Sequence, residues 1–230
     1  MGKLINLLLS ALLAPLIYSF LYEACLFFIA NADFYLVSWF TYGFLFYIVI
    51  YILILQHIID FIEIFEHELG HAIVAWLFLK DVREFWVSPE GGKVNWLDGS
   101  DSLITLAPYY LPVFTIPLAV IQPFVFYPIH LIIDFLIGFT LAFHYAALFR
   151  KEFRWSQSDI KKTGRIFSFC VVCILNIIVL VIILCIVSRN YLGILNYFKN
   201  SFARTPESYQ TALRILTMLS DLADQLLHTG

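Results

Sequence analysis

Charged side chains are scarce in this chain. They make up 13% of its 230 residues, whereas 61% of the residues are hydrophobic. A soluble globular domain has about 25% charged and about 45–50% apolar residues, so the low charge excludes an ordinary soluble domain. The net charge of -3 also lacks the basic excess that is typical of nucleic-acid-binding proteins. The composition therefore predicts an integral membrane protein with no nucleic-acid partner.

Cysteine is scarce too, and the four cysteines all lie in apolar stretches. Cys170 and Cys173 have the C-x-x-C spacing of redox and zinc sites, but no second pair accompanies them. We interpret the cysteines as small membrane residues without redox or metal chemistry.

Long apolar runs dominate what is present. A membrane helix needs about 20 predominantly apolar residues. The runs that suit a crossing are 1–30, 36–55, 103–121, 124–149 and 167–187. Polar residues after 55 leave two interpretations of 36–79, one long helix or two helices with a bend near 56–60. The loop 150–165 is rich in lysine and arginine, which places it in the cytoplasm by the positive-inside rule. We expect five spans in a multi-pass protein of the bacterial inner membrane, with the N-terminus inside and the C-terminus outside.

Two polar segments complete the predicted architecture. Residues 83–96 place aromatic and β-branched residues on both sides of a Pro-Glu-Gly-Gly turn, which predicts a β-hairpin. Thr205 followed by Pro206 predicts a helix start, and leucines then recur at helical spacing opposite acidic residues. This amphipathic helix is expected to lie on the membrane or on a membrane partner. The fold class is thus all-α and polytopic, with a membrane domain over 1–190 and an amphipathic region over 191–230.

The stretch His67-Glu68-Leu69-Gly70-His71 contains the HExxH pattern inside an apolar run. Residues i and i+4 lie on the same face of a helix, so both imidazoles can bind one Zn²⁺, with the Glu68 carboxylate beside it as a base for water. Two histidines and a glutamate are costly in an apolar helix, and a bound metal explains their presence. The pattern predicts Zn²⁺ as the cofactor and Glu68 as the catalytic residue.

A catalytic zinc site has three protein ligands and one position open to water. Asp134 is the preferred third ligand, because it stands alone in an apolar run where an ionised carboxylate needs a cation. Asp159 is the alternative, although its position just before a span also suits a helix N-cap. His144 and His57 are weaker alternatives. The residues themselves leave the third ligand open.

These features resemble the site-2 protease family of intramembrane zinc metalloproteases, in particular its small members without a PDZ domain. The resemblance covers roughly residues 60–145, and the HExxH stretch is its specific part. Pro89-Glu90-Gly91-Gly92 is similar to the family's glycine-rich hairpin. Ala107-Pro108 falls where the family often has Gly-Pro, and Asp134, with Gly138 after it, falls at its Asp-Gly ligand motif. The chain departs from the family pattern in lacking an Asn after Pro108 and a Gly directly after Asp134.

The resemblance implies a zinc-dependent metalloendopeptidase that hydrolyses peptide bonds of membrane-anchored protein substrates. Glu68 would be the general base for the zinc-bound water. Gly91, Gly92 and Pro108 are the expected substrate-binding residues, since a hairpin edge can hold an extended peptide. The alternative is a non-catalytic membrane protein with a structural or vestigial zinc site that acts through partner binding by its C-terminal helix. A metal-dependent enzyme acting on lipid is a third, weaker interpretation.

Overall fold

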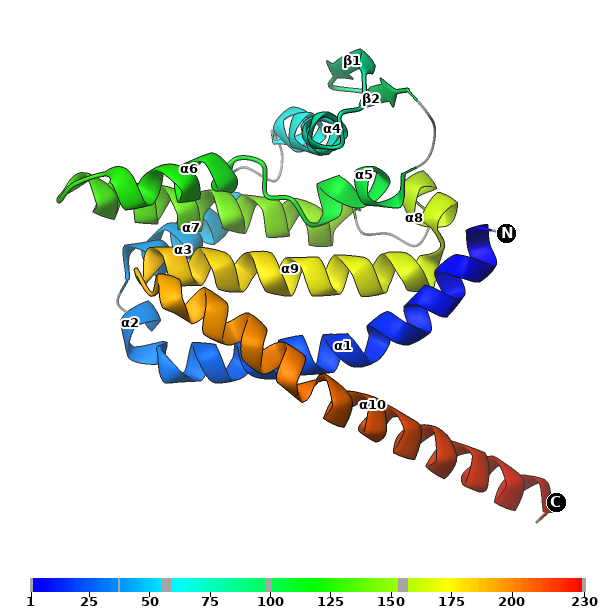
Figure 1. Ribbon diagram of the computed structural model, residues 1–230. Helices are drawn as coiled ribbons and strands as arrows, with labels where there is room; N and C mark the ends of the chain where they lie inside the picture. The colour runs from blue at the N-terminus through cyan, green and yellow to red at the C-terminus, as the bar shows by residue number, and fades with distance from the viewer. Residues whose placement is uncertain (1, 37, 55–58, 98–100, 153–156, 229–230) are drawn as a thin grey trace.

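The chain folds into helices with a small β-hairpin at one edge (Figure 1). The computed structural model describes residues 2–36, 38–54, 59–97, 101–152 and 157–228. Within these ranges, β1 (Val82–Ser88) and β2 (Gly91–Trp96) form a two-stranded antiparallel sheet in which Ser88 pairs with Gly91. The predicted helical class and the predicted hairpin at 83–96 are confirmed.

Three long helices form the apolar body. α7 (Ile129–Ala147) packs against α9 (Arg165–Val187) through Ile137, Leu141 and Leu184. α1 (Gly2–Ala30) contacts the other side of α9, where Phe20 packs against Val181. Figure 1 shows that α1 and α9 begin at the same side of the molecule and that α7 runs the opposite way.

The same helices carry the membrane-spanning character. Among the described residues, three helical segments are long and apolar enough to cross a membrane: Ile5–Ala30, Ile129–Arg150 and Arg165–Val187. They correspond to the first, fourth and fifth predicted spans and support a membrane protein. Five spans are not confirmed.

The other two predicted spans fold into shorter pieces. α3 (Trp39–Leu53) has 15 residues, and it precedes a separate helix, α4 (Asp60–Leu77). The run 103–121 divides into α5 (Ser102–Leu106), the 3-10 turn η2 (Ala107–Tyr109) and α6 (Thr115–Ile121), which leads into η3 (Gln122–Phe124). Proline has no N–H and interrupts helical hydrogen bonding, so Pro108 and Pro112 account for the division. The predicted bend near 56–60 and part of the basic loop 150–165 lie outside the described residues.

α3 and α7 approach each other through a reciprocal pair of glycines. A Cβ on Gly43 would lie 1.9 Å from the carbonyl oxygen of Phe135, and one on Gly138 would lie 1.9 Å from that of Phe40. Any larger residue would strike the backbone of the neighbouring helix. The small α2 (Ala32–Leu36) joins α1 to this pair.

α4 crosses the body rather than extending it. In Figure 1 it is seen nearly end-on, whereas α7 and α9 run across the view, and the hairpin lies over it. The π-helical turn η4 (Leu148–Glu152) follows α7 and contains Arg150, which binds Asp60 (2.8 Å) and Glu63 of α4. His144 Nδ1 lies 3.4 Å from Glu66 Oε1, so α4 is also held from the side of α7.

The C-terminal helix is longer than the sequence indicates. α10 (Tyr191–His228) continues through Pro206, and the Thr205 hydroxyl donates to the carbonyl of Ser201 one turn earlier (3.1 Å). The prediction of a helix start at Thr205 is therefore wrong. The first half of α10 packs on α1, where Arg204 pairs with Glu23 (2.7 Å). These contacts stabilise the part of α10 that precedes Pro206. The rest of α10 projects from the body (Figure 1).

Candidate metal centre

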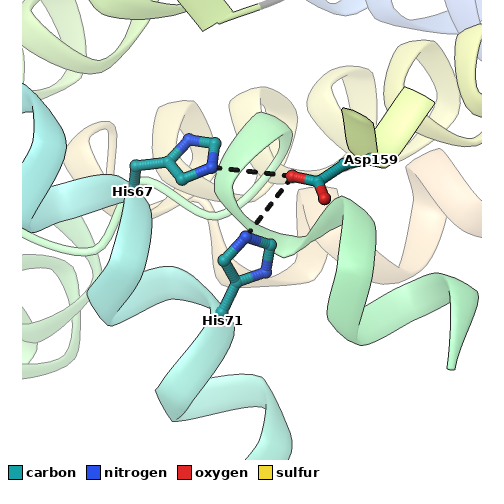
Figure 2. A group of neighbouring side chains, drawn as sticks. All are labelled: His67, His71 and Asp159. Atoms are coloured by element: carbon teal, nitrogen blue, oxygen red, sulfur yellow. Dashed lines mark ion pairs between the residues drawn. The ribbon is translucent and has the colours of Figure 1, made fainter. Parts of the chain in front are cut away.

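His67 and His71 extend from the same face of α4 towards Asp159, which lies in the first turn of α8 (Ser158–Thr163) (Figure 2). Asp159 Oδ2 is 3.7 Å from His67 Nε2 and 3.5 Å from His71 Nε2. One ligand atom from each of the three residues lies within 4.8 Å of the others. The HExxH helix and a carboxylate from a distant helix therefore converge on one point.

The spacing of these atoms suits a small tetrahedral metal ion. Zn–N and Zn–O bonds are about 2.0–2.2 Å long, so tetrahedral ligand atoms are about 3.3–3.6 Å apart. The two measured carboxylate–imidazole distances, 3.5 and 3.7 Å, are within about 0.2 Å of that range. The ligand atoms of all three residues lie within 4.8 Å of one another, so movements of the side chains would let them surround one ion.

The hydrogen bonding of His71 also favours a cation at this point. Its Nδ1 is 2.8 Å from the carbonyl oxygen of Ile104. A carbonyl only accepts hydrogen bonds, so Nδ1 carries a proton and Nε2 is the nitrogen turned towards Asp159. A nitrogen held in this direction can donate a proton to the carboxylate or bind a metal ion beside it. Zinc-binding histidines commonly donate their other N–H to a carbonyl in this way.

The surroundings of Asp159 favour its ionised carboxylate. Burial by itself would raise the pKa of its carboxyl, but the neighbouring His67 and His71 side chains outweigh burial and hold the pKa well below its ordinary value. The hydroxyl of Tyr109 donates to Oδ2 (3.3 Å), and the carbonyl of Tyr109 accepts from Asn176 of α9 (2.8 Å). The fully buried Tyr109 thus connects the carboxylate to the helical body.

A cavity of about 640 Å³ opens beside the three side chains, between α4, β2 and α8. This volume is within the range of about 300–1,000 Å³ that is usual for ligand sites. Glu68 lines the cavity and is 8% exposed. A Cβ on Gly92 would lie 2.3 Å from Glu68 Cγ and 2.7 Å from its Oε1. Any larger residue at 92 would displace the Glu68 side chain or β2, so glycine lets β2 lie directly against the predicted catalytic carboxylate.

The structure places Asp134, the preferred third ligand, apart from this centre and brings Asp159, the alternative, to the two histidines. Asp134 accepts a hydrogen bond from Gln122 (3.0 Å). It lies ten residues before His144 on α7, about 15 Å along the helix axis, and His144 is the residue that contacts α4. The lone buried carboxylate has its polar partner in Gln122 of η3, so no metal is needed to explain it.

The remaining predicted site residues divide into two groups. Gly91 and Gly92 line the cavity, and their role in binding a substrate stays a prediction. Pro108 instead packs against α4, where its Cα would be 3.2 Å from a Cβ on Gly70. His144 contacts Glu66 rather than the two histidines. His57 lies outside the described residues.

Three contributors to the centre were not predicted. They are the hydroxyl of Tyr109, the carbonyl of Ile104 and the indole of Trp96, whose ring centroid lies 5.8 Å from that of His71. Tyr109 follows Pro108 within the apolar run 103–121, and a tyrosine next to a helix-breaking proline was the available signal. A backbone carbonyl leaves no signal in a sequence.

Comparison of the chain with protein-family models, with curated proteins and with solved structures finds no match. The geometry of the centre must therefore carry the functional argument.

Proposed function

We propose that this protein is a zinc metalloprotease that hydrolyses peptide bonds of membrane-anchored proteins. The observation that carries the proposal is the convergence of both HExxH histidines with Asp159 at 3.5 and 3.7 Å, beside a cavity lined by Glu68. The family resemblance of the HExxH stretch points to the same activity.

His67, His71 and Asp159 are the residues that would hold the metal. Two imidazoles and one carboxylate form a donor set used by catalytic zinc, and also by non-haem iron. The adjoining glutamate of HExxH favours zinc and hydrolysis. When bound, Zn²⁺ supplies a Lewis acid and lowers the pKa of water towards 7.

Glu68 would serve as the general base. It follows His67 directly on α4, and on a helix adjacent residues point about 100° apart, so its carboxylate lies beside the ligands instead of among them. It would accept a proton from the attacking water and deliver it to the amine nitrogen that leaves as the peptide bond breaks. Its packing against Gly92 keeps the carboxylate at the wall of the cavity.

β2 suits an extended peptide as the substrate. Gly92, Lys93 and Val94 of this strand line the cavity. β2 pairs with β1 on one side, and among the described residues no strand covers its other edge. An extended chain can add to such an edge through backbone hydrogen bonds. A transmembrane helix would have to unwind to bind in this way, because its carbonyls are otherwise engaged.

The proposal is tested with Glu68→Gln, which keeps the size of the side chain and removes its basicity. The wild type and this variant are expressed in the same host, and new peptide termini in membrane proteins are compared by mass spectrometry. We expect termini that depend on the wild type and disappear with Glu68→Gln, while zinc content and thermal stability stay the same. Identical termini in both samples would argue against proteolysis.

The non-catalytic alternative rests on the projecting part of α10. Leu213, Leu216 and Met218 are each more than 60% exposed there, which suits a helix that binds a partner. If this alternative is correct, truncation before residue 205 abolishes the cellular effect of the protein and Glu68→Gln leaves it intact.

A further inference from the structure

A second cavity lies where the first turns of α1 and α9 meet the end of α8. Its volume is about 570 Å³. Leu7 of α1 and Ile166 of α9 form apolar walls, and both are more than half exposed. Lys161 and Arg165 provide two exposed cations at the same place. The proposed peptidase chemistry uses none of these residues.

The charge of this cavity is one-sided. Among the described residues that line it, none is acidic, and no ion pair between described residues engages Lys161 or Arg165. α9 begins at Arg165 without a side-chain cap, which adds the partial positive charge of a 23-residue helix. The cavity is therefore complementary to an anion that also carries apolar groups.

The position of the cavity identifies the kind of anion. Both α1 and α9 contain candidate membrane spans, and the cavity lies at the end of each where the span begins. Figure 1 shows these two ends on the same side of the molecule, next to α8. Lipid headgroups occupy this level of a membrane, and basic pockets between spans bind anionic headgroups.

We propose that the cavity binds an anionic phospholipid. Its phosphate would lie between Lys161 and Arg165, and its acyl chains would follow the exposed apolar walls at Leu7 and Ile166.

The same geometry connects the lipid to the metal centre. Residues two apart on a helix point about 200° apart, so α8 directs Asp159 to the metal and Lys161 to the lipid cavity. Thr163 at the end of α8 accepts a hydrogen bond from Asn6 of α1 (2.5 Å), and its hydroxyl donates to the carbonyl of Asp159 (2.8 Å). A lipid that holds Lys161 and Arg165 would fix α8 and hence Asp159. This connection rests on the proposed metalloprotease function, whereas the lipid site itself does not.

The lipid site is tested by the melting temperature of the purified full chain in micelles with phosphatidylglycerol or phosphatidylcholine. At about 100-fold excess over Kd, we expect phosphatidylglycerol to raise the melting temperature by about 5–10 °C. The rise should be absent in Lys161→Gln/Arg165→Gln. It should persist in Arg83→Gln/Lys199→Gln, which loses the same charge from exposed positions elsewhere. An equal rise in the first double variant, or an equal rise with glycerol phosphate in place of the lipid, would overturn the site.

The connection to the metal is tested by the rate at which a chelator removes zinc. We expect phosphatidylglycerol to slow this removal several-fold in the wild type and not in Lys161→Gln/Arg165→Gln. An unchanged rate, together with a retained rise in melting temperature, supports the lipid site and overturns the connection. Wild-type protein that holds no zinc contradicts the proposed function, and the melting temperatures then still decide the lipid site.

Discussion

Asp159 and Asp134 have the same side chain but different surroundings in this protein. Asp159 faces two imidazoles and the hydroxyl of Tyr109, whereas Asp134 accepts from the Gln122 amide on a helix that does not reach the histidines. A carboxylate becomes a metal ligand through the groups that surround it, and only Asp159 has a metal-binding set around it.

This difference predicts the response of the metal to substitution. Asp159→Asn removes an anionic ligand, so we expect zinc affinity to fall by more than the roughly 10–100-fold that follows loss of an outer hydrogen-bond partner. Asp134→Asn should leave the affinity unchanged. Chelator competition on the purified variants measures both values, and equal effects of the two substitutions would contradict the assignment of Asp159.

A second prediction concerns the contact between Gly92 and Glu68. In Gly92→Ala the new methyl group would lie 2.3 Å from Glu68 Cγ, so the carboxylate or β2 must move. We expect cleavage to fall by about 100-fold, the effect of a displacement near 1 Å, with zinc still bound. Asn95→Ala, at an exposed position of the same strand, should retain cleavage. Full activity of Gly92→Ala would show that this contact does not position Glu68.

The sequence was sufficient for the part of the site that is local. His67, Glu68 and His71 are related by the geometry of one helix, and the i, i+4 spacing predicts their common face. Asp159 meets them only because α8 packs against α5 and α9, and no periodicity in the sequence indicates that packing. An isolated aspartate in an apolar run was a reasonable indication of a metal ligand. In the structure, however, the buried Gln122 donates a hydrogen bond to Asp134.

At the scale of elements, the packing of α3 on α7 depends on two glycines. Gly138→Ala would place a methyl group 1.9 Å from the Phe40 carbonyl oxygen, and neither backbone can yield without moving a helix. We expect a loss of about 1–3 kcal/mol in stability, the usual cost of overpacking, seen as a lower melting temperature in detergent.

The matched control for this prediction is Gly193→Ala in α10. A Cβ there would meet the side chain of Asn190 at 2.8 Å, and a side chain can turn away. Turning Asn190 away loses its hydrogen bond from the Gly193 N–H (3.0 Å), but alanine favours the helix by about 1 kcal/mol over glycine, so the control should melt close to the wild type. If Gly138→Ala melts with it, the close approach of α3 and α7 is not required for stability.

Elements with a local cause were predicted well. The hairpin follows from its turn residues and its aromatic strands, and α9 follows from an uninterrupted apolar run. Prolines were harder to interpret, because their effect depends on tertiary contacts. Pro108 and Pro112 divide the run that was expected to form a span, whereas Pro206 lies within α10, which is held on α1 through Arg204.

At the scale of the whole molecule, the contact between α1 and α10 joins the two ends of the chain. Arg204 binds Glu23, which is 7% exposed, and its guanidinium lies 3.9 Å from the centroid of the Tyr22 ring. The apolar composition of the first helix gave no reason for Glu23, and this ion pair supplies one. The contact holds the first half of α10 on the body.

Glu23→Gln is expected to loosen α10. The substitution weakens the charged hydrogen bond from Arg204 (2.7 Å), so backbone amides of α10 near residue 200 should exchange with solvent faster than in the wild type. Glu207→Gln removes the more exposed acidic partner of Arg204 and should have a much smaller effect. Equal exchange in both variants would show that Glu23 does not hold the helix.

The overall class followed from composition, while the arrangement of the helices did not. Three predicted spans correspond to helices that are long and apolar enough to cross a membrane. Arg150 and His144 hold α4 across the body by contacting its acidic residues Asp60, Glu63 and Glu66. In the sequence these residues are only polar positions after an apolar run. Their partners lie on α7 and η4, and the sequence does not indicate that pairing.

The central claim is that His67, His71 and Asp159 bind zinc. X-ray absorption at the zinc edge of the purified wild-type protein tests it most directly, because the spectrum reports the ligand atoms. We predict one zinc per chain with imidazole and oxygen ligands at about 2.0–2.2 Å, and loss of this signal in His71→Ala. A protein without zinc, or a spectrum with sulfur at about 2.3 Å, would contradict the account.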